Sequence, residues 1–262
     1  MNTYDFDGQV VVVTGAARGI GRRIAERFLQ NGASVAVCGR SARDADEIVS
    51  ELAQVAGGDA SRVMYASCDV SDPQQIDAFF SQVVQRFGAF DVLVNNAGIW
   101  EATPVGTVDE ATWERNVNVN LKSQFFACQW FADYHRANGG GRAIVNISSV
   151  SSVLTGPTTV LYNMCKAGTN SLTKTFAHDL GDLGIRVNAV GPGSIPTELN
   201  AAAYADPAAE QNMRDSLVLG RRGTKDEIAS CVLFLASEDA SYVTGQVLFA
   251  DGGWLLQQAP KR

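Results

Sequence analysis

The sequence predicts a single doubly wound α/β domain, with a seven-stranded parallel sheet and helices on both faces. Short β-branched runs alternate with longer amphipathic stretches along the whole chain, which is the pattern of repeated β–α–β units. No Pro- or Ser-rich linker and no change in composition divides the 262 residues. We therefore expect one domain over residues 1–262.

Strands are expected where apolar runs are short and end at turn residues. The run Gln9–Thr14 (QVVVVT) is almost continuously apolar and is followed by Gly15, as expected for a strand buried on both faces. Six further strands are expected at Ser34–Cys38, Val63–Ala66, Asp91–Asn95, Arg142–Ser148, Ile185–Val190 and Gln246–Ala250.

Helices are expected between these strands, where apolar residues recur with a helical period. Gly19–Gln30 places Ile24 and Phe28 on one face. Asp72 and Pro73 supply an N-cap and a first-turn proline for the helix after the third strand. Further helices are expected at Asp44–Val55, Thr112–Asn138 and Leu161–Leu180.

Composition and charge exclude several classes of partner. With 21 basic and 28 acidic residues, the net charge of −7 disfavours nucleic acids and anionic lipid surfaces. No apolar run approaches the roughly 18 residues needed to cross a membrane, and the polar, acidic N-terminus is not a signal peptide. Five dispersed cysteines and two histidines predict no metal site and no disulfide framework, and indicate reduced thiols in a cytoplasmic protein.

A glycine-rich turn joins the first strand to the first helix. In Thr14–Gly21 (TGAARGIG), Gly15 permits a tight turn, Gly19 lets the backbone approach a pyrophosphate, and Gly21 permits close packing of helix on strand. The backbone N–H groups at the helix N-terminus, around Arg18 and Ile20, would face the phosphates. The turn therefore predicts a Rossmann-type dinucleotide site, with a glycine turn that binds nothing as the alternative.

The end of the second strand bears on the choice of cofactor. A dinucleotide fold that prefers NAD usually has an acidic residue there for the ribose 2′-OH, but this strand ends Val37-Cys38-Gly39-Arg40. The guanidinium groups of Arg40 and Arg18 would suit a 2′-phosphate. We therefore predict that NADP is preferred over NAD. The alternative is that both arginines are ordinary surface charges and that NAD is used.

Tyr162 and Lys166 are four residues apart, so they lie on one face of the expected helix. Ser149 follows the fifth strand directly, at the edge where open α/β sheets bind ligands, and Asn120 lies in the expected helix after the fourth strand. At these residues the chain resembles the short-chain dehydrogenase/reductase family. The resemblance covers nearly the whole chain, and its marks are Thr14–Gly21, Asn95-Asn96-Ala97-Gly98, Asn120, Ser149, Tyr162-x-x-x-Lys166, Pro192-Gly193, Gly245 and Asp251-Gly252-Gly253.

The resemblance implies a catalytic role for each of four residues. Tyr162 is the acid/base that moves the proton of the alcohol oxygen. Lys166 would lower the pKa of Tyr162 by favouring the phenolate, and would bond the nicotinamide ribose. Ser149 would hold and polarise the substrate oxygen. Asn120 would order a water that links Lys166 to bulk solvent.

The resemblance also implies cofactor contacts outside the glycine turn. Asp69 would meet the adenine, although a structural aspartate in a turn is the alternative. Asn95 would lie beside the cofactor, although it can equally tie adjacent strands together. The further positions implied are Val70, Ala97, Ile195 and Thr197, besides Tyr162 and Lys166.

The substrate is expected to be chosen by a loop at about residues 191–218, which follows a strand end and fits neither element pattern. Its first part resembles that of sugar dehydrogenases such as bacterial glucose 1-dehydrogenases and rhamnose 1-dehydrogenases. A pocket bordered by Glu198 and Asn200 would suit a carbohydrate or polyol. The alternatives are a 3-oxoacyl thioester or general ketone reductase, for which Arg221 and Arg222 could form part of a basic carrier site, and a non-catalytic nucleotide sensor. The complete catalytic set argues against the sensor.

Members of the family of this size are usually homotetramers, so the resemblance implies one here. An apolar face of the expected long helix is consistent with such an interface, but it can equally pack on the sheet. This face comprises Phe125, Phe126, Trp130 and Phe131.

Overall fold

A computed structural model describes residues 4–41, 45–155, 158–198, 200–201 and 205–256. Its centre is a seven-stranded sheet in the order β3-β2-β1-β4-β5-β6-β7, in which every neighbouring pair is parallel. The predicted single doubly wound α/β domain is thereby confirmed. The strands lie within two residues of the predicted bounds: β1 Val10–Thr14, β2 Ser34–Gly39, β3 Val63–Ser67, β4 Val92–Asn95, β5 Ala143–Ile147, β6 Arg186–Pro192 and β7 Val247–Ala250.

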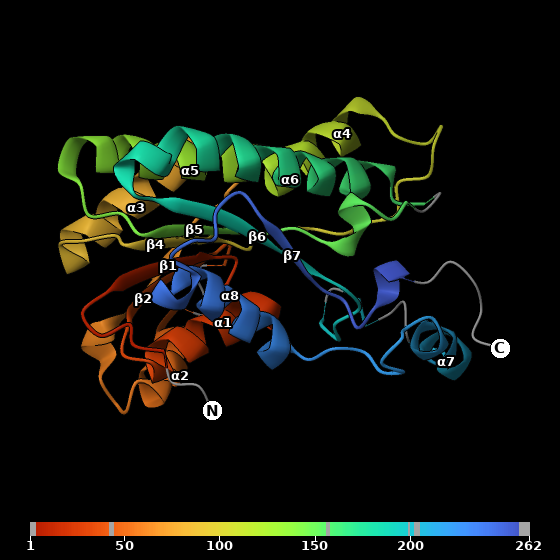
Figure 1. Ribbon diagram of the computed structural model, residues 1–262, viewed down its shortest axis with the longest axis horizontal. Coiled ribbons are helices and arrows are strands. Elements are labelled where there is room, and N and C mark those ends of the chain that lie inside the picture. Colours follow the sequence, from red (N-terminus) through yellow and green to blue (C-terminus); the bar gives the residue numbers. More distant parts are fainter. Residues whose placement is uncertain (1–3, 42–44, 156–157, 199, 202–204, 257–262) are drawn as a thin grey trace.

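Helices cover both faces of the sheet (Figure 1). One layer holds α3, α5 and α6, and the other holds α1, α2 and α8, while α7 stands apart from both beyond the end of the sheet. The bounds are α1 Gly19–Gln30, α2 Ala45–Val55, α3 Pro73–Phe87, α4 Glu110–Val117, α5 Ser123–Asn138, α6 Val160–Leu180, α7 Pro207–Asp215 and α8 Lys225–Ala236. The helix start expected at Asp44 lies outside the described residues, as do residues 199 and 202–204 of the expected substrate loop.

Two helices were not predicted from the sequence. Part of the expected substrate loop is helical, since α7 begins at the N-cap Asp206 and has Pro207 in its first turn. The helix α8 begins with a capping box, in which the Thr224 side chain accepts from the backbone of Glu227 and the Glu227 side chain accepts from the backbone of Thr224. Six of the twelve residues of α8 are buried and only Asp226 and Glu227, in its first turn, are exposed, so its sequence lacks the polar stripe that marks a surface helix.

The expected single helix Thr112–Asn138 is wrong in one respect. A π-helical turn at Asn118–Lys122 separates α4 from α5, and it contains Asn120. A π turn accommodates one extra residue without breaking the helix, so the apolar period on either side gives no sign of it. Such turns occur frequently at functional sites.

The core has two layers, because successive strand residues point to opposite faces. In β1, Val11 and Val13 join the cluster under α1, α2 and α8, whereas Val10 and Val12 join the cluster under α3, α5 and α6. The helices α1 and α8 pack together, and Asp226 accepts from Arg23 at 2.7 Å. The first and last large helices thus close one face jointly.

The aromatic face of the expected long helix divides between core and surface. Phe131 is fully buried and meets Phe90 edge to face, with ring centroids 5.1 Å apart. Trp130 packs against Phe80 at the same centroid distance. Phe125 remains 43% exposed. Within the part of the chain that the structure describes, no helix has both the length and the apolar character to cross a bilayer.

Candidate active site

Ser149 and Tyr162 meet at the carboxyl end of the sheet. Ser149 follows β5 and caps the short 3₁₀ helix Val150–Ser152, with its Oγ accepting from the backbone N–H of Ser151 at 3.1 Å. Tyr162 lies in the first turn of α6 and forms a side-chain hydrogen bond with Ser149. The structure therefore brings the predicted acid/base together with the group predicted to hold the substrate oxygen.

Lys166 lies one turn further along α6 and is only 3% exposed. Its Nζ donates to the carbonyl of Ile147 at 2.8 Å and lies 5.5 Å from the centre of the Tyr162 ring. Burial lowers the pKa of Lys166 to about 8. The carbonyl of β5 thus fixes the position of this cation.

The expectation that Lys166 lowers the pKa of Tyr162 does not hold in this structure. Burial raises the pKa of Tyr162 to about 12, and the hydrogen bond with Ser149 opposes that rise only in part. The Lys166 ammonium points to the Ile147 carbonyl rather than to the phenol oxygen. Tyr162 is therefore a protonated phenol at neutral pH, ready to donate.

Asn120 lies beside Lys166, on the other side of Gly98. Its Oδ1 accepts from the backbone N–H of Ile99 at 2.9 Å. A Cβ atom on Gly98 would lie 3.0 Å from this Oδ1 and 3.9 Å from the Lys166 Nζ, so a glycine is needed between them. Asn120 is fully buried, yet its Nδ2 has no partner among the described residues. A buried amide donor of this kind fits a bound water.

Hydrogen bonds and close contacts join the glycine-rich turn Thr14–Gly21 to the segment that follows β4. Thr14 Oγ1 accepts from the backbone N–H groups of Asn96 and Ala97, both at 3.1 Å. Gly15 has a φ of +65°, and a Cβ there would lie 2.7 Å from the Cα of Ala97. A Cβ on Gly21 would collide with the Asn96 amide. These two glycines therefore serve the packing of β1 against β4 as well as the approach of a ligand.

The N-terminus of α1 has the features that a dinucleotide requires. Gly19 has a φ of +67°, and the Arg18 side chain does not cap the helix. Its first backbone N–H groups are thus left for an anion. Arg18 and Arg40 are exposed, and neither forms an ion pair within the described residues. The residues at this end of the sheet therefore fit a nicotinamide dinucleotide.

Two of the predicted cofactor residues have structural partners. Asp69 Oδ1 accepts from the backbone and hydroxyl of Ser71 at 2.9 and 2.8 Å, which is a turn. Asn95 Nδ2 donates to Asn146 Oδ1 at 2.9 Å and thereby ties β4 to β5. These are the structural roles that the sequence left open, and the cofactor contacts of both residues stay predictions. Val70 is buried behind Asp69.

The loop after β6 is held by Asn200. Its Nδ2 donates to the Ile195 carbonyl at 2.7 Å, and its Oδ1 accepts from the backbone N–H of Thr197 at 3.1 Å. Its side chain therefore stabilises the loop, and it also borders an open hollow together with Glu198, as the sequence predicted. That this hollow takes a carbohydrate or polyol stays a prediction. Glu198 pairs with Lys225, with 3.3 Å between Oε1 and Nζ.

Arg222 anchors this loop to the rest of the domain. Its side chain is 9% exposed and donates to Ser194 Oγ at 2.9 Å, Glu210 Oε2 at 3.0 Å and Asn200 Oδ1 at 3.3 Å. Arg221 pairs with Glu227. The two arginines therefore do not form the free basic patch that the sequence left open. The sequence carries no local signal for the anchoring role, because the partners are 12 to 28 residues away.

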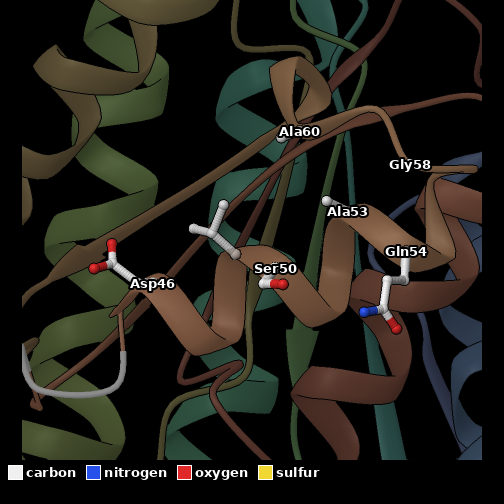
Figure 2. Close-up of a pocket in the computed structure, with 7 residues that line it drawn as sticks. Asp46, Ser50, Ala53, Gln54, Gly58 and Ala60 are labelled. Carbon is white, nitrogen blue, oxygen red and sulfur yellow. The ribbon is translucent and has the colours of Figure 1, made fainter.

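The described part of the chain has an open hollow beside the loop after β6 and another along α2. The smaller, about 310 Å³, is lined by residues 196–198 and 200–201 together with Arg222 and Lys225. The larger, about 480 Å³, lies along α2, where Asp46, Ser50 and Gln54 follow one another on the helix (Figure 2). No predicted catalytic or cofactor residue lines the hollow along α2, so we assign it no part in the chemistry.

Comparison with a family model gives a match over residues 15–255, and the model is described as "Enoyl-(Acyl carrier protein) reductase". A 3β-hydroxysteroid dehydrogenase of Eggerthella lenta is 38% identical over 96% of this chain and 95% of its own. The 3-oxoacyl-acyl-carrier-protein reductase FabG of Thermotoga maritima is 38% identical over 95% and 99% of the two chains.

Two further similar proteins have names that concern sugars or sugar acids. An L-rhamnose 1-dehydrogenase (NAD(P)(+)) of Sphingomonas sp. is 38% identical over 94% of this chain and 96% of its own. The solved structure of a gluconate 5-dehydrogenase of Burkholderia cenocepacia, in complex with NADP and tartrate, is 34% identical over 98% of each chain, with a TM-score of 0.89. The chain belongs to the short-chain dehydrogenase/reductase family, and it is an NAD- or NADP-dependent oxidoreductase that acts on CH–OH groups of small molecules.

Proposed function

We propose that this protein is an NADP-preferring dehydrogenase that oxidises a hydroxyl group of a sugar or polyol. The observation that carries the reaction is the Ser149–Tyr162 hydrogen bond, with Lys166 held one turn away. It lies at the same sheet edge as the uncapped N-terminus of α1. We therefore propose that the proton-transfer site and the phosphate site both lie at this edge.

The proton chemistry belongs to the residues of α6 and β5. NADP, when bound, supplies the hydride acceptor or donor. Ser149 Oγ holds the substrate oxygen, and in oxidation Tyr162 Oη takes its proton as the phenol's own proton leaves towards Lys166, with the reverse in reduction. Lys166 Nζ would bond the nicotinamide ribose and would pass the proton onward, and the Asn120 amide would order the water that receives it.

The cofactor would be held along the carboxyl edge of the sheet. The backbone from Arg18 to Gly21, including Gly19 and Ile20, would receive the pyrophosphate at the α1 N-terminus, with Gly15 allowing the turn. Arg18 and Arg40 would pair with the 2′-phosphate. The remaining contacts we propose are Asp69 and Val70 at the adenine, and Asn95, Ala97, Ile195 and Thr197 towards the nicotinamide.

The preference for NADP rests on the exposed Arg18 and Arg40, for which the described residues supply no ion-pair partner, and on the lack of a carboxylate at the end of β2 in the sequence. We expect a higher kcat/KM with NADPH than with NADH, and a KM for NADPH that rises about tenfold in Arg40→Ala. Arg142→Ala is the control, because Arg142 lies at the opposite edge, before β5, in an exposed pair with Glu238. Better kinetics with NADH, or an unchanged KM in Arg40→Ala, would refute the preference.

The substrate class rests on the similarity to the rhamnose and gluconate dehydrogenases, because Glu198 and Asn200 are engaged within the protein. We propose that the loop at about 191–218 selects the substrate. A panel of aldoses, polyols and sugar acids, followed by NADPH absorbance, tests the class. Turnover of steroids or simple ketones with no sugar oxidised would contradict it.

A 3-oxoacyl thioester reductase is the second candidate, favoured by the similarity to the Thermotoga maritima reductase. Against it, Arg222 is engaged with Ser194, Glu210 and Asn200, and Arg221 with Glu227, so neither is free for an acidic carrier. An acetoacetyl thioester in the same panel, with and without carrier protein, distinguishes the two candidates. Carrier-stimulated reduction would favour the reductase.

We also propose a homotetramer in the cytoplasm. Large apolar side chains remain exposed on α4, α5 and α6, which lie in one layer: Trp113, Phe125 and Met164. A second set is exposed near the outer strand β7: Tyr242 in the turn before the strand and Leu248 within it. The five free cysteines support a reducing compartment. Size-exclusion chromatography with light scattering tests the tetramer, and a monomeric mass would refute it.

A further inference from the structure

Three buried amide side chains follow one another along the helix that contains the π turn. Asn116 and Asn120 are 0% exposed and Gln124 is 1% exposed. All three lie against α6. The Asn116 carbonyl accepts from Cys165 Sγ at 3.9 Å, Asn120 lies beside Lys166 across Gly98, and Gln124 Oε1 accepts from Thr169 Oγ1 at 3.0 Å. The amides thus form a polar row inside the interface between α4–α5 and α6.

In each side-chain amide of this row, one of the two polar atoms is hydrogen-bonded and the other has no partner among the described residues. The unpartnered atoms are Asn116 Oδ1, Asn120 Nδ2 and Gln124 Nε2. Buried polar atoms are almost always hydrogen-bonded, and water is the usual partner where protein supplies none. Three such atoms at four-residue intervals therefore indicate a shared set of bound waters.

The spacing suits water bridges. The three amides follow one another at about one helical turn, and side chains one turn apart lie about 5–6 Å from each other, which is roughly the length of two hydrogen bonds. The donors and acceptors also match between Asn116 and Asn120. A water can accept from Asn120 Nδ2 and donate to Asn116 Oδ1, which leaves its second proton for another partner.

One end of the row meets a partly exposed carboxylate. Asn116 Nδ2 donates to the carbonyl of Thr112 at 2.9 Å and to the carboxylate of Glu101. The Glu101 side chain is 34% exposed and is held by Arg115 at 3.1 Å. At the other end, Gln124 meets Thr169, which is fully buried. A proton that leaves the site along this row would reach water at Glu101.

We propose that Asn116 is a positioning residue for proton exchange, holding a file of waters that connects Lys166 and Asn120 with the surface carboxylate Glu101. This rests on the proposed proton route through Lys166. In oxidation, Tyr162 takes the substrate proton as its own phenol proton leaves towards Lys166. The Lys166 ammonium takes up that proton as it releases one to the first water, so both groups end in the state in which they began. Each water then accepts one proton and releases another, until Glu101 delivers it to solvent. In reduction every transfer runs in reverse, so no further oxidant or reductant is needed.

The test uses Asn116→Leu, which keeps the size of the side chain and removes its polar atoms. We expect kcat to fall about tenfold with both KM values unchanged, and the solvent deuterium isotope effect on kcat to rise. We also expect a small buffer such as imidazole to restore kcat in the variant and to leave the natural enzyme unaffected, because it replaces the lost water path. Gln9→Leu is the control, since Gln9 also has an unpartnered buried amide oxygen but lies before β1, at the opposite edge of the sheet.

A second variant keeps the proposal testable if Asn116→Leu does not fold. Glu101→Gln changes only the exposed end of the row. We expect this variant to have a kcat about threefold lower, and we expect its kcat to depend more strongly on buffer concentration. A fall in kcat without buffer rescue would assign Asn116 a purely structural role and overturn the proposal. Unchanged isotope effects in both variants would also overturn it. These kinetic measurements can be made with any substrate that the enzyme turns over. If the sugar assignment is wrong, the natural enzyme itself does not oxidise sugars, so that failure is distinguishable from failure of the proton-exchange proposal.

Discussion

The catalytic wall of the site, formed by Ser149, Tyr162 and Lys166, is held by long elements, whereas the loop wall, residues 193–198 and 200–201, depends on two side chains. Lys166 is fixed from β5 through the Ile147 carbonyl, and Ser149 follows the same strand. The loop wall is held by Asn200 from within and by Arg222 from outside. Changes in the loop wall can therefore alter the substrate without moving the proton chemistry.

The largest effect is expected in the catalytic wall. Tyr162→Phe removes the proton donor and acceptor, so kcat should fall about 1000-fold, in the range usual for loss of a general acid/base. Binding of NADPH, measured by fluorescence titration, should stay near normal, because the ring and the fold are kept. Tyr134→Phe is the matched control, since Tyr134 stacks on Trp130 away from the site. Substantial turnover in Tyr162→Phe would show that Tyr162 is not the acid/base of the reaction.

The second effect concerns the buried Lys166. Its pKa of about 8 in the folded protein lies below the ordinary 10.5. Between these two values the unfolded chain holds a proton that the folded chain has released, so this residue's contribution makes the protein more stable as pH rises. The full gain is up to about 3 kcal/mol, at 1.36 kcal/mol per pH unit.

Urea unfolding of the natural protein and of Lys166→Met, from pH 7 to pH 10, measures this contribution. As pH rises above 8, the unfolding free energy of the natural protein should increase relative to that of Lys166→Met. Below pH 8 the difference should be constant. If the unfolding free energies of the two proteins change in parallel from pH 7 to pH 10, Lys166 keeps its ordinary pKa and is not desolvated in solution.

A smaller effect is expected in the loop wall. Arg222→Leu removes three hydrogen bonds to Ser194, Asn200 and Glu210, so we expect kcat/KM to fall about tenfold, which corresponds to about 1.4 kcal/mol. The change should appear mainly in the KM values, because the loop is misplaced while Tyr162 is not. Arg222→Lys should be intermediate, and Arg221→Leu is the neighbouring control. A fall in kcat alone would show that the two walls are coupled.

The smallest effect is expected at Glu198. A Cβ on Gly19 would lie 3.6 Å from Glu198 Oε2, so the carboxylate lies close to the N-terminus of α1. Its side chain is 52% exposed, and such charges are screened by water. Glu198→Gln should therefore lower the KM for NADPH only about twofold, and the difference should vanish at high salt. A raised KM would mean that the carboxylate assists cofactor binding.

The sequence predicted best what depends on local pattern. The strands, the Thr14–Gly21 turn and the pairing of Tyr162 with Lys166 all follow from spacing within a few residues. The prediction of a lowered pKa for Tyr162 was wrong, because burial raises this pKa and the extent of desolvation depends on the whole surrounding structure. The role of Arg222 was missed because its partners come from separate turns of the chain. The helix α8 was missed because half of its residues are buried and its exposed residues are confined to the first turn, so it shows no polar stripe.

The pairing of α1 with α8 has a consequence for how the protein is made. Hydrogen bonds from Arg23 and Arg27 reach Asp226 and Ser230, which are 199 to 203 residues further along the chain. During synthesis the apolar side of α1 stays uncovered until α8 leaves the ribosome. Domains with such distant contacts complete folding late and expose aggregation-prone surface until then. We therefore expect a nascent chain that stops before residue 225 to need a chaperone, although it already contains every catalytic residue.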